Sequence, residues 1–236
     1  MSVNCVIGLQ WGDEGKGRIV DYLAQKADMV IRFQGGDNAG HTVVNEKGKF
    51  GLHILPSGIF NDNTMNIVGA GTVVNFDRMH SELEDIEKVT GEKIESVFID
   101  ERAHVIMPYH MALDGAEEGK RSESEKIGTT KRGIGPCYQD KAARCGIRAA
   151  DILDEETLKK KLSALLGKKN RELEYYGLPT YTLEELLAKA KAWREEFGDH
   201  IIDTNPAVRE AVEEGRNILL EGQLGIMRDN DWGIYP

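Results

Sequence analysis

Residues 8–21 read GLQWGDEGKGRIVD, and this stretch decides the fold class. An apolar run at residues 4–7 precedes it and an amphipathic run at residues 15–25 continues from it, so glycines and a lysine stand between a predicted strand and a predicted helix. Glycines let backbone N–H groups approach phosphate oxygens, and the start of a helix adds partial positive charge. The stretch predicts a phosphate-binding turn, although a tight strand-to-helix turn without a ligand has the same outline.

The turn departs from the Walker A pattern G-x-x-x-x-G-K-[ST] at two places. Gln10 stands where the first glycine belongs, and Gly17 follows Lys16 where a hydroxyl would hold Mg²⁺. Asp13 lies inside the turn, and a carboxylate beside a polyphosphate is repelled unless a cation sits between them. We therefore expect Asp13 to be a Mg²⁺ ligand, and it could also act as a base on a substrate beside the terminal phosphate.

Strand-like and helical patterns alternate along the chain. Further apolar runs lie at residues 29–33, 66–68, 96–99 and 217–220, and a second helical pattern lies at residues 76–89, with Asn75 as its N-cap. This alternation predicts an α/β fold like that of P-loop NTPases, with a mostly parallel sheet flanked by helices.

The middle of the chain has a different pattern. Three lysine-rich or amphipathic helical patterns begin near residues 154, 182 and 205, and Thr182 and Glu185 have capping-box spacing. We interpret residues 151–215 as a helical insertion with its lysines on a solvated face, after which the chain returns to the sheet at Asn217. Residues 1–236 are then a single α/β nucleotide-binding domain, truncated at its C-terminus.

Composition and charge exclude several classes of protein. The 236 residues have a net charge of −10, which argues against a general nucleic-acid binder. The sequence has no signal-peptide pattern and no run of about 18 apolar residues, so we expect no membrane association. Three cysteines without a CxxC motif indicate a reduced, cytoplasmic location.

Two more glycine-rich clusters carry candidate site residues. Residues 34–42, QGGDNAGHT, follow the run at 29–33, so they should reach the same sheet edge as the first turn. The Gly40 carbonyl could face a cation, and His41 could donate to a developing oxyanion. A lone histidine is more often structural, but the glycines before His41 and the nearby phosphate loop make the two roles about equally open. Residues 127–136, IGTTKRGIGP, form either an anion cradle or a solvated loop.

Five motifs together resemble adenylosuccinate synthetases. They are QWGDEGKG (10–17), GGDNAGHT (35–42), LHILPSGI (52–59), IGTTKRGIGPCYQDKAAR (127–144) and EGQLG with DWGIYP (221–236), in the family's order. The resemblance covers the whole chain but about half of a typical member. It implies Mg²⁺- and GTP-dependent ligation of L-aspartate to IMP, through a 6-phosphoryl-IMP intermediate, in AMP biosynthesis.

The resemblance also implies roles for individual residues. Asp13 would be the base that removes the purine N1 proton, His41 the general acid, and Asp13 with the Gly40 carbonyl the Mg²⁺ ligands. The implied GTP phosphate site comprises Gly12, Asp13, Glu14, Gly15, Lys16, Gly17, Arg18, Gly40, His41 and Thr42. The implied substrate contacts are Asp13, Lys16, Asn38, Ala39, Gly40, His41, Thr130, Arg144 and Gln223, with Arg144 reaching the partner subunit's site in a homodimer.

Three departures accompany the resemblance. Asp37 stands where members often carry histidine or asparagine, and we expect its carboxylate to point to solvent. The family's E-G-A-Q-G is here Glu221-Gly222-Gln223-Leu224-Gly225, which moves the glutamine by one position. The family's guanine-recognising and aspartate-binding segments would lie beyond residue 236, so residues 1–236 alone should have little synthetase activity.

Two other functions stay open on the sequence. One is a truncated nucleotide-binding and dimerising module without catalysis. The other is a viral relative that ligates aspartate to a guanine nucleotide, which Asp13 disfavours because that group lacks aspartate at this position.

Overall fold

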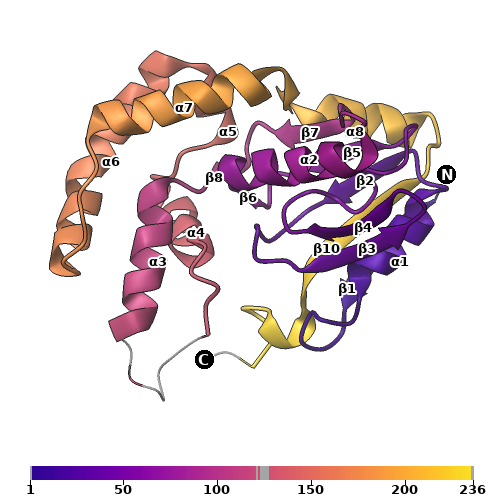
Figure 1. Ribbon diagram of the computed structural model, residues 1–236, viewed down its shortest axis with the longest axis horizontal. Helices are drawn as coiled ribbons and strands as arrows, with labels where there is room; N and C mark the ends of the chain where they lie inside the picture. The colour runs from indigo at the N-terminus through magenta and orange to yellow at the C-terminus, as the bar shows by residue number, and fades with distance from the viewer. Residues whose placement is uncertain (1, 121, 123–127, 235–236) are drawn as a thin grey trace.

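The computed structural model describes residues 2–120, 122 and 128–234, and a six-stranded sheet lies at its centre (Figure 1). In spatial order the strands are β1 (Val3–Gly8), β10 (Ile218–Gly225), β2 (Met29–Arg32), β5 (Met65–Val68), β7 (Val97–Asp100) and β9 (Ile201–Ile202). All neighbouring pairs are parallel, which confirms the predicted α/β class. Every strand therefore ends at the same edge of the sheet.

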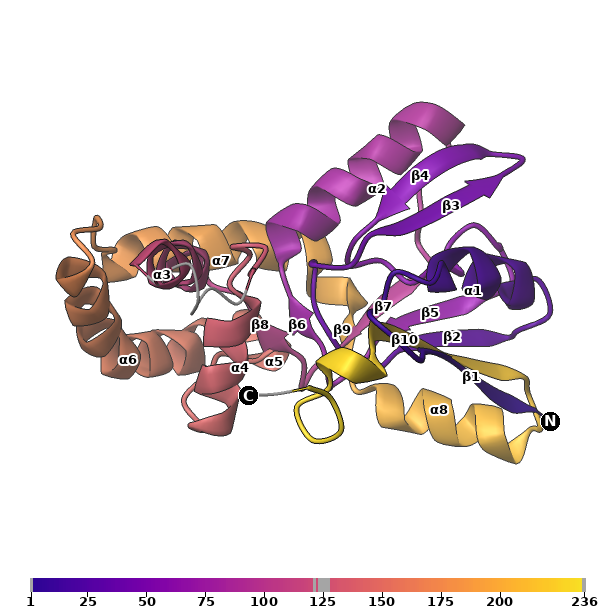
Figure 2. The ribbon, with the colours of Figure 1, turned by 90° about the horizontal axis from the view of Figure 1, so that it is seen from below.

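Helices cover both faces of this sheet. α1 (Lys16–Ala24) packs Val20 against Val30 and Leu219 on one face. α8 (Thr204–Glu213) packs Ala211 on the other face, against Met29 and its neighbours. Figure 2 shows α1 and α8 on opposite sides of the strands. Successive residues of a strand point to opposite faces, so the consecutive apolar residues of β2 and β10 make both faces of these strands apolar. A strand covered by helices on both faces has this pattern.

A hairpin and a short parallel pair flank the sheet. β3 (His41–Asn45) and β4 (Gly48–Leu52) form the antiparallel hairpin, and β6 (Val73–Val74) pairs with β8 (His104–Val105). α2 (Phe76–Thr90) begins where predicted, since the Asn75 side chain accepts a hydrogen bond from the backbone N–H of Arg78.

The remaining helices make the arm on the left of Figure 1. They are α3 (Pro108–Lys120), α4 (Ile134–Ala142), α5 (Ala149–Leu153), α6 (Glu155–Tyr175) and α7 (Leu183–Phe197). Trp193 of α7 packs on Phe76 with a centroid separation of 5.5 Å, and its Nε1 donates to Asp77 at 2.7 Å. The predicted capping box of Thr182 and Glu185 is present at the start of α7.

Two predictions about this region are wrong. The chain returns to the sheet at Ile201, not Asn217, because β9 is only two residues long and leaves no periodic pattern. Not every lysine of α6 faces solvent: Lys169 is 4% exposed, and its Nζ lies 2.7 Å from Asp140 Oδ1. The other oxygen of this carboxylate accepts from His110 Nε2 at 2.8 Å, so a buried polar cluster joins α3, α4 and α6.

No helix within the described part of the chain combines the length and the apolar character that crossing a membrane requires.

Candidate functional site

Three loops gather where the parallel strands end. Loop 1 (residues 9–15) follows β1, loop 2 (residues 33–40) follows β2, and loop 3 (residues 128–133) precedes α4. Loops at the carboxyl ends of parallel strands are the usual ligand sites of open α/β sheets. The predicted site residues of the first two clusters are therefore brought together by the topology.

Loop 1 has the backbone of an anion site. Gly12 and Gly15 have φ values of 94° and 85°, a region that favours glycine. Gly15 is the N-cap of α1 and offers no side-chain cap, so the first N–H groups of the helix keep their hydrogen-bonding capacity. A Cβ added to Gly15 or Gly40 would meet no atom within 4 Å, so the space above both residues is open. Phosphate oxygens fit this geometry.

Lys16 is held against loop 1. Its side chain is almost fully buried, and its Nζ donates to the Gly12 carbonyl at 2.9 Å and lies 3.7 Å from Glu14 Oε2. Burial lowers the pKa of Lys16, while the charges of Glu14, Glu221 and Asp13 act in the opposite direction. The ammonium group therefore points into loop 1, where it partly offsets the negative charge of the neighbouring carboxylates.

The residues present suit a magnesium ion shared with phosphate rather than a closed metal cage. Within the described ranges, no group of three or more His, Cys, Asp or Glu side chains could hold a metal. Mg²⁺ in nucleotide sites commonly uses one or two carboxylates and completes its shell with phosphate oxygens and water. Asp13 is an exposed carboxylate within loop 1, and Gly40 is exposed on loop 2.

His41 lies at the start of β3, in close contact with the first turn of α1. A Cβ added to Gly17 would lie 2.5 Å from the His41 Cβ, so only glycine permits this approach. The ring is 5% exposed, and its Nδ1 lies 2.7 Å from Glu221 Oε1. Its Nε2 is buried and has no hydrogen-bond partner among the described residues. The histidine therefore lies directly beside loop 1 and the first turn of α1.

Glu221 is a site residue that the sequence analysis missed. It is fully buried on β10 and accepts from the Ser57 N–H at 2.9 Å and from Ser57 Oγ at 2.6 Å. Burial would raise the pKa of Glu221, but hydrogen bonds from His41 and Ser57 and the charges of His41 and Arg32 lower it overall. The only signal in the sequence is a carboxylate directly after the apolar run Ile218-Leu219-Leu220.

Gln223 reaches loop 2 despite its shifted position. Its Nε2 donates to Asn38 Oδ1 at 2.7 Å, and a Cβ on Gly35 would lie 1.7 Å from its Oε1. β10 continues beyond the predicted apolar run at residues 217–220, as far as Gly225. Its pairing with β1 advances four residues, from 221 to 225, while β1 advances two, from 6 to 8. This irregularity re-aims side chains near the strand end.

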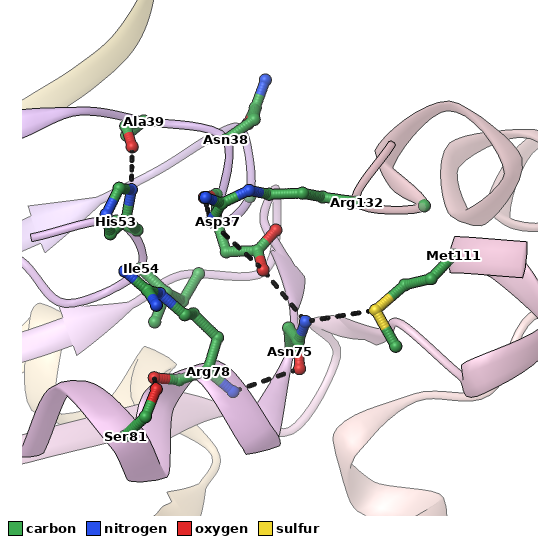
Figure 3. Close-up of polar contacts among 12 residues, drawn as sticks. Asp37, Asn38, Ala39, His53, Ile54, Asn75, Arg78, Ser81, Met111 and Arg132 are labelled. Atoms are coloured by element: carbon green, nitrogen blue, oxygen red, sulfur yellow. Dashed lines mark hydrogen bonds and ion pairs between the residues drawn. The ribbon is translucent and has the colours of Figure 1, made fainter. Parts of the chain in front are cut away.

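Asp37 contradicts its predicted exposure, because it is 2% exposed. Asn75 donates to its Oδ2 at 2.9 Å (Figure 3), and Arg132 of loop 3 donates to its backbone carbonyl at 2.7 Å. Its Oδ1 has no partner among the described residues. Burial raises the pKa of Asp37, against the Arg132 charge and the Asn75 bond. Asp37 thus joins loop 2 to α2 and loop 3.

The other predicted residues lie at the rim or away from the three loops. Arg18, Thr42 and Thr130 are exposed, whereas Ala39 is buried and its carbonyl accepts from His53 Nδ1. Glu14 Oε1 accepts from the Gln10 N–H at 2.7 Å. Ile127 of the third cluster lies outside the described residues.

Arg144 is not brought to the loops of its own chain by any hydrogen bond or ion pair of the described residues. It is exposed, has a φ of 60°, and follows the end of α4 that lies opposite loop 3. Its side chain is free to act beyond the chain's own loop cluster.

Known proteins share this arrangement. The sequence profile of adenylosuccinate synthetase matches residues 5–236. Adenylosuccinate synthetase 1 of Methanosarcina acetivorans is 45% identical over 236 residues, which is 100% of this chain and 55% of the relative. That of Listeria welshimeri is 45% identical over 237 residues, with the same coverage. The chain therefore spans about half the length of the curated relatives it matches.

Solved structures agree with the sequence comparison. The fully ligated adenylosuccinate synthetase of Plasmodium falciparum matches with a TM-score of 0.87 and 35% identity, over 99% of this chain and 54% of that one. The succinoaminodeoxyadenylate synthetase of cyanophage S-2L, bound to dGMP and to dATP as an energy donor, matches with a TM-score of 0.63 over 100% of this chain and 55% of that one. At 21% identity this second likeness shows the fold alone. The chain belongs to the adenylosuccinate synthetase family.

Proposed function

We propose that this chain supplies the phosphate-binding and proton-transfer part of an enzyme that joins L-aspartate to IMP at the expense of GTP. The products are adenylosuccinate, GDP and phosphate. The observation that carries the proposal is the contact between Gly17 and His41, because it places a buried imidazole beside a phosphate-binding turn.

In the first step, Asp13 accepts the proton from purine N1, and the purine O6 attacks the γ-phosphorus of GTP. GDP leaves, and purine O6, a poor leaving group by itself, now carries the phosphoryl group as 6-phosphoryl-IMP. The exposed carboxylate of Asp13 in loop 1 supports this role, since a base must reach a substrate that lies beside the terminal phosphate.

Lys16, the loop 1 N–H groups and His41 stabilise the charge that moves between the phosphates. Phosphoryl transfer depends mainly on positioning and on neutralising negative charge. Asp13 and the Gly40 carbonyl would hold Mg²⁺, which would supply further neutralisation of the phosphate charge.

In the second step, the aspartate amine attacks purine C6 and phosphate leaves, which forms the C–N bond. Asn38, Ala39, Thr130 and Gln223 would contact the IMP nucleotide. The exposed position of Arg144 supports its assignment to the partner's site in a homodimer. The three free thiols accord with the cytoplasmic location that belongs to this proposal.

The test consists of turnover and binding measurements on the whole protein in which residues 1–236 occur. Adenylosuccinate formation is measured with GTP, IMP, L-aspartate and Mg²⁺ for the wild type, Asp13→Ala and Asp85→Ala. Asp85 is the matched control, because its side chain is 76% exposed on α2. We expect Asp13→Ala to lower turnover at least about 100-fold with an unchanged circular dichroism spectrum, and Asp85→Ala to match the wild type.

Turnover of Asp13→Ala within tenfold of the wild type would overturn the base assignment. Separate calorimetric titrations of GTP and IMP distinguish the alternative function. If the wild type binds one nucleotide but forms no adenylosuccinate, the chain is a nucleotide-binding module rather than a synthetase.

A further inference from the structure

We propose that Glu221, held in place by Ser57, is a positioning residue that fixes which nitrogen of His41 carries the proton and where Nε2 points. The inference deepens the proposed function and rests on it for its catalytic consequence. Its structural part concerns this chain alone and is tested without any turnover.

The hydrogen bonds around Glu221 define the direction of each donor. An ionised carboxylate can only accept, so the 2.7 Å contact with His41 Nδ1 and the 2.6 Å contact with Ser57 Oγ both require donors on the partner side. Hydrogen bonds to the carboxylate lower the pKa of Glu221 despite its burial, so it is ionised at neutral pH. The His41 ring must therefore carry a proton on Nδ1.

The second oxygen of Glu221 prevents its carboxylate from turning. Oε2 accepts from the backbone N–H of Ser57 at 2.9 Å, and a backbone donor cannot reverse its role. Glu221 also lies on an interior strand of the sheet, paired with Val6 on one side and Arg32 on the other. A carboxylate on a strand that is paired on both sides, with both oxygens engaged, holds the imidazole in one orientation.

The remaining ring nitrogen faces the candidate site. Nε2 is buried without a partner among the described residues, and His41 contacts the first turn of α1. With Nδ1 committed to Glu221, only Nε2 can accept or donate a proton toward a ligand over loop 1. A buried aspartate fixes the tautomer of the histidine in a Ser-His-Asp triad by the same arrangement.

Glu221→Gln reverses this arrangement with almost no change in volume. The Ser57 N–H needs an acceptor, so the amide oxygen takes the place of Oε2 and the NH₂ group faces His41 Nδ1. A donor opposite Nδ1 makes that nitrogen an acceptor and moves the single ring proton to Nε2. The proposal thus predicts that Glu221→Gln changes the tautomer of His41. A purely structural role for Glu221 predicts no such change.

The experiment is long-range ¹H–¹⁵N NMR of the histidine rings in the whole chain, with His41 assigned by its loss in His41→Gln. We expect the wild-type ring to hold its proton on Nδ1 and the Glu221→Gln ring to hold it on Nε2. Glu82→Gln is the matched control: Glu82 is also a buried carboxylate that accepts from backbone N–H groups, at residues 53–55, and its loss should leave the His41 tautomer unchanged.

A wild-type ring protonated on Nε2 with Nδ1 bare, or the same tautomer in Glu221→Gln as in the wild type, would overturn the proposal. If Glu221→Gln does not fold, the wild-type spectrum decides alone: a hydrogen-bonded proton on Nδ1 supports the proposal and a bare Nδ1 overturns it. Where the wild type turns over, Glu221→Gln should lower kcat at least about 100-fold with KM for GTP within about threefold. Absence of turnover would count against the proposed function and leave the tautomer result standing on its own.

Discussion

Replacing Lys169 by methionine should lower the free energy of unfolding by about 3 kcal/mol, because it leaves Asp140 buried without its cation. Lys169 Nζ is the charge partner of Asp140 at 2.7 Å, and the carboxylate is 3% exposed. Removing one partner of a buried ion pair typically costs about 3–5 kcal/mol. We expect the lower end, because His110 keeps its hydrogen bond to the other carboxylate oxygen.

The direction of that remaining bond is fixed by the backbone. The Met107 N–H donates to His110 Nδ1 at 3.0 Å, so Nδ1 is an acceptor and Nε2 carries the proton that Asp140 receives. Burial lowers the pKa of His110, so the ring is neutral at pH 7 and cannot replace the lost charge. Lys169 also lies 3.5 Å from Glu172, whose side chain is 36% exposed and can be solvated without it. Asp140 is the buried anion that has no other cation, which is why Lys169 is the sensitive position.

Urea unfolding followed by circular dichroism measures the effect. Lys168→Met is the matched control, since Lys168 is 59% exposed and its ion pair with Glu172, at 3.7 Å, lies at the surface. This variant should change stability by less than about 0.5 kcal/mol. The double variant Lys169→Met with Asp140→Asn removes both charges and should recover at least half of the loss. Losses that simply add, or Lys169→Met within 1 kcal/mol of the wild type, would refute this reasoning.

Three further predictions concern glycine packing and pH. Gly17→Ala should destabilise the protein by about 1–3 kcal/mol and weaken GTP binding, because the new Cβ would lie 2.5 Å from the His41 Cβ; Gly115→Ala, with open space around it on α3, should be neutral or stabilising. Asp37→Asn should stabilise the protein at pH 7 by about 1 kcal/mol, since it removes a negative charge that burial disfavours. His104 has a pKa lowered to about 4, mainly by burial, so stability should fall by about 3 kcal/mol as the pH drops from 6.5 to 4.

Each of these three predictions gives the direction of a change in stability, and a change in the other direction would contradict it. The folded-state pKa of Asp37 is raised, so the advantage of Asp37→Asn must grow as pH rises above the unfolded value of about 3.9 and must shrink below it. The folded-state pKa of His104 is lowered, so His104→Gln must lose less stability between pH 6.5 and 4 than the wild type does. Equal unfolding curves for Gly17→Ala and Gly115→Ala would contradict the packing argument.

Much of the fold follows from local patterns in the sequence. β2 and β10 have apolar residues on successive positions because α1 and α8 cover both faces, and α2 and α7 begin at side chains that cap their first turns. The parallel topology then brings loops 1 and 2 together without further information. These features were predictable because each depends on residues close in the chain.

Other features depend on partners far along the chain. In the sequence, Glu221 looks like the exposed end of a strand, because a charged residue after an apolar run usually faces solvent. In the structure, its carboxylate is buried and accepts hydrogen bonds from His41 and Ser57, which are 180 and 164 residues away in the chain. In the sequence, Lys169 cannot be told from the exposed lysines of α6, because its buried partner Asp140 lies on another helix. Asp37 is buried only because Asn75 and Arg132 converge on it. No local pattern reports such contacts.

The strand order sets when this molecule can fold during its synthesis. β10 lies between β1 and β2, so these two strands, made first, cannot join until residues 218–225 have left the ribosome. Contacts of such long sequence separation slow folding, and the early strands wait with unpaired edges that chaperones must protect from aggregation. Because Glu221 is on that late strand, His41 acquires its buried partner only as the sheet closes.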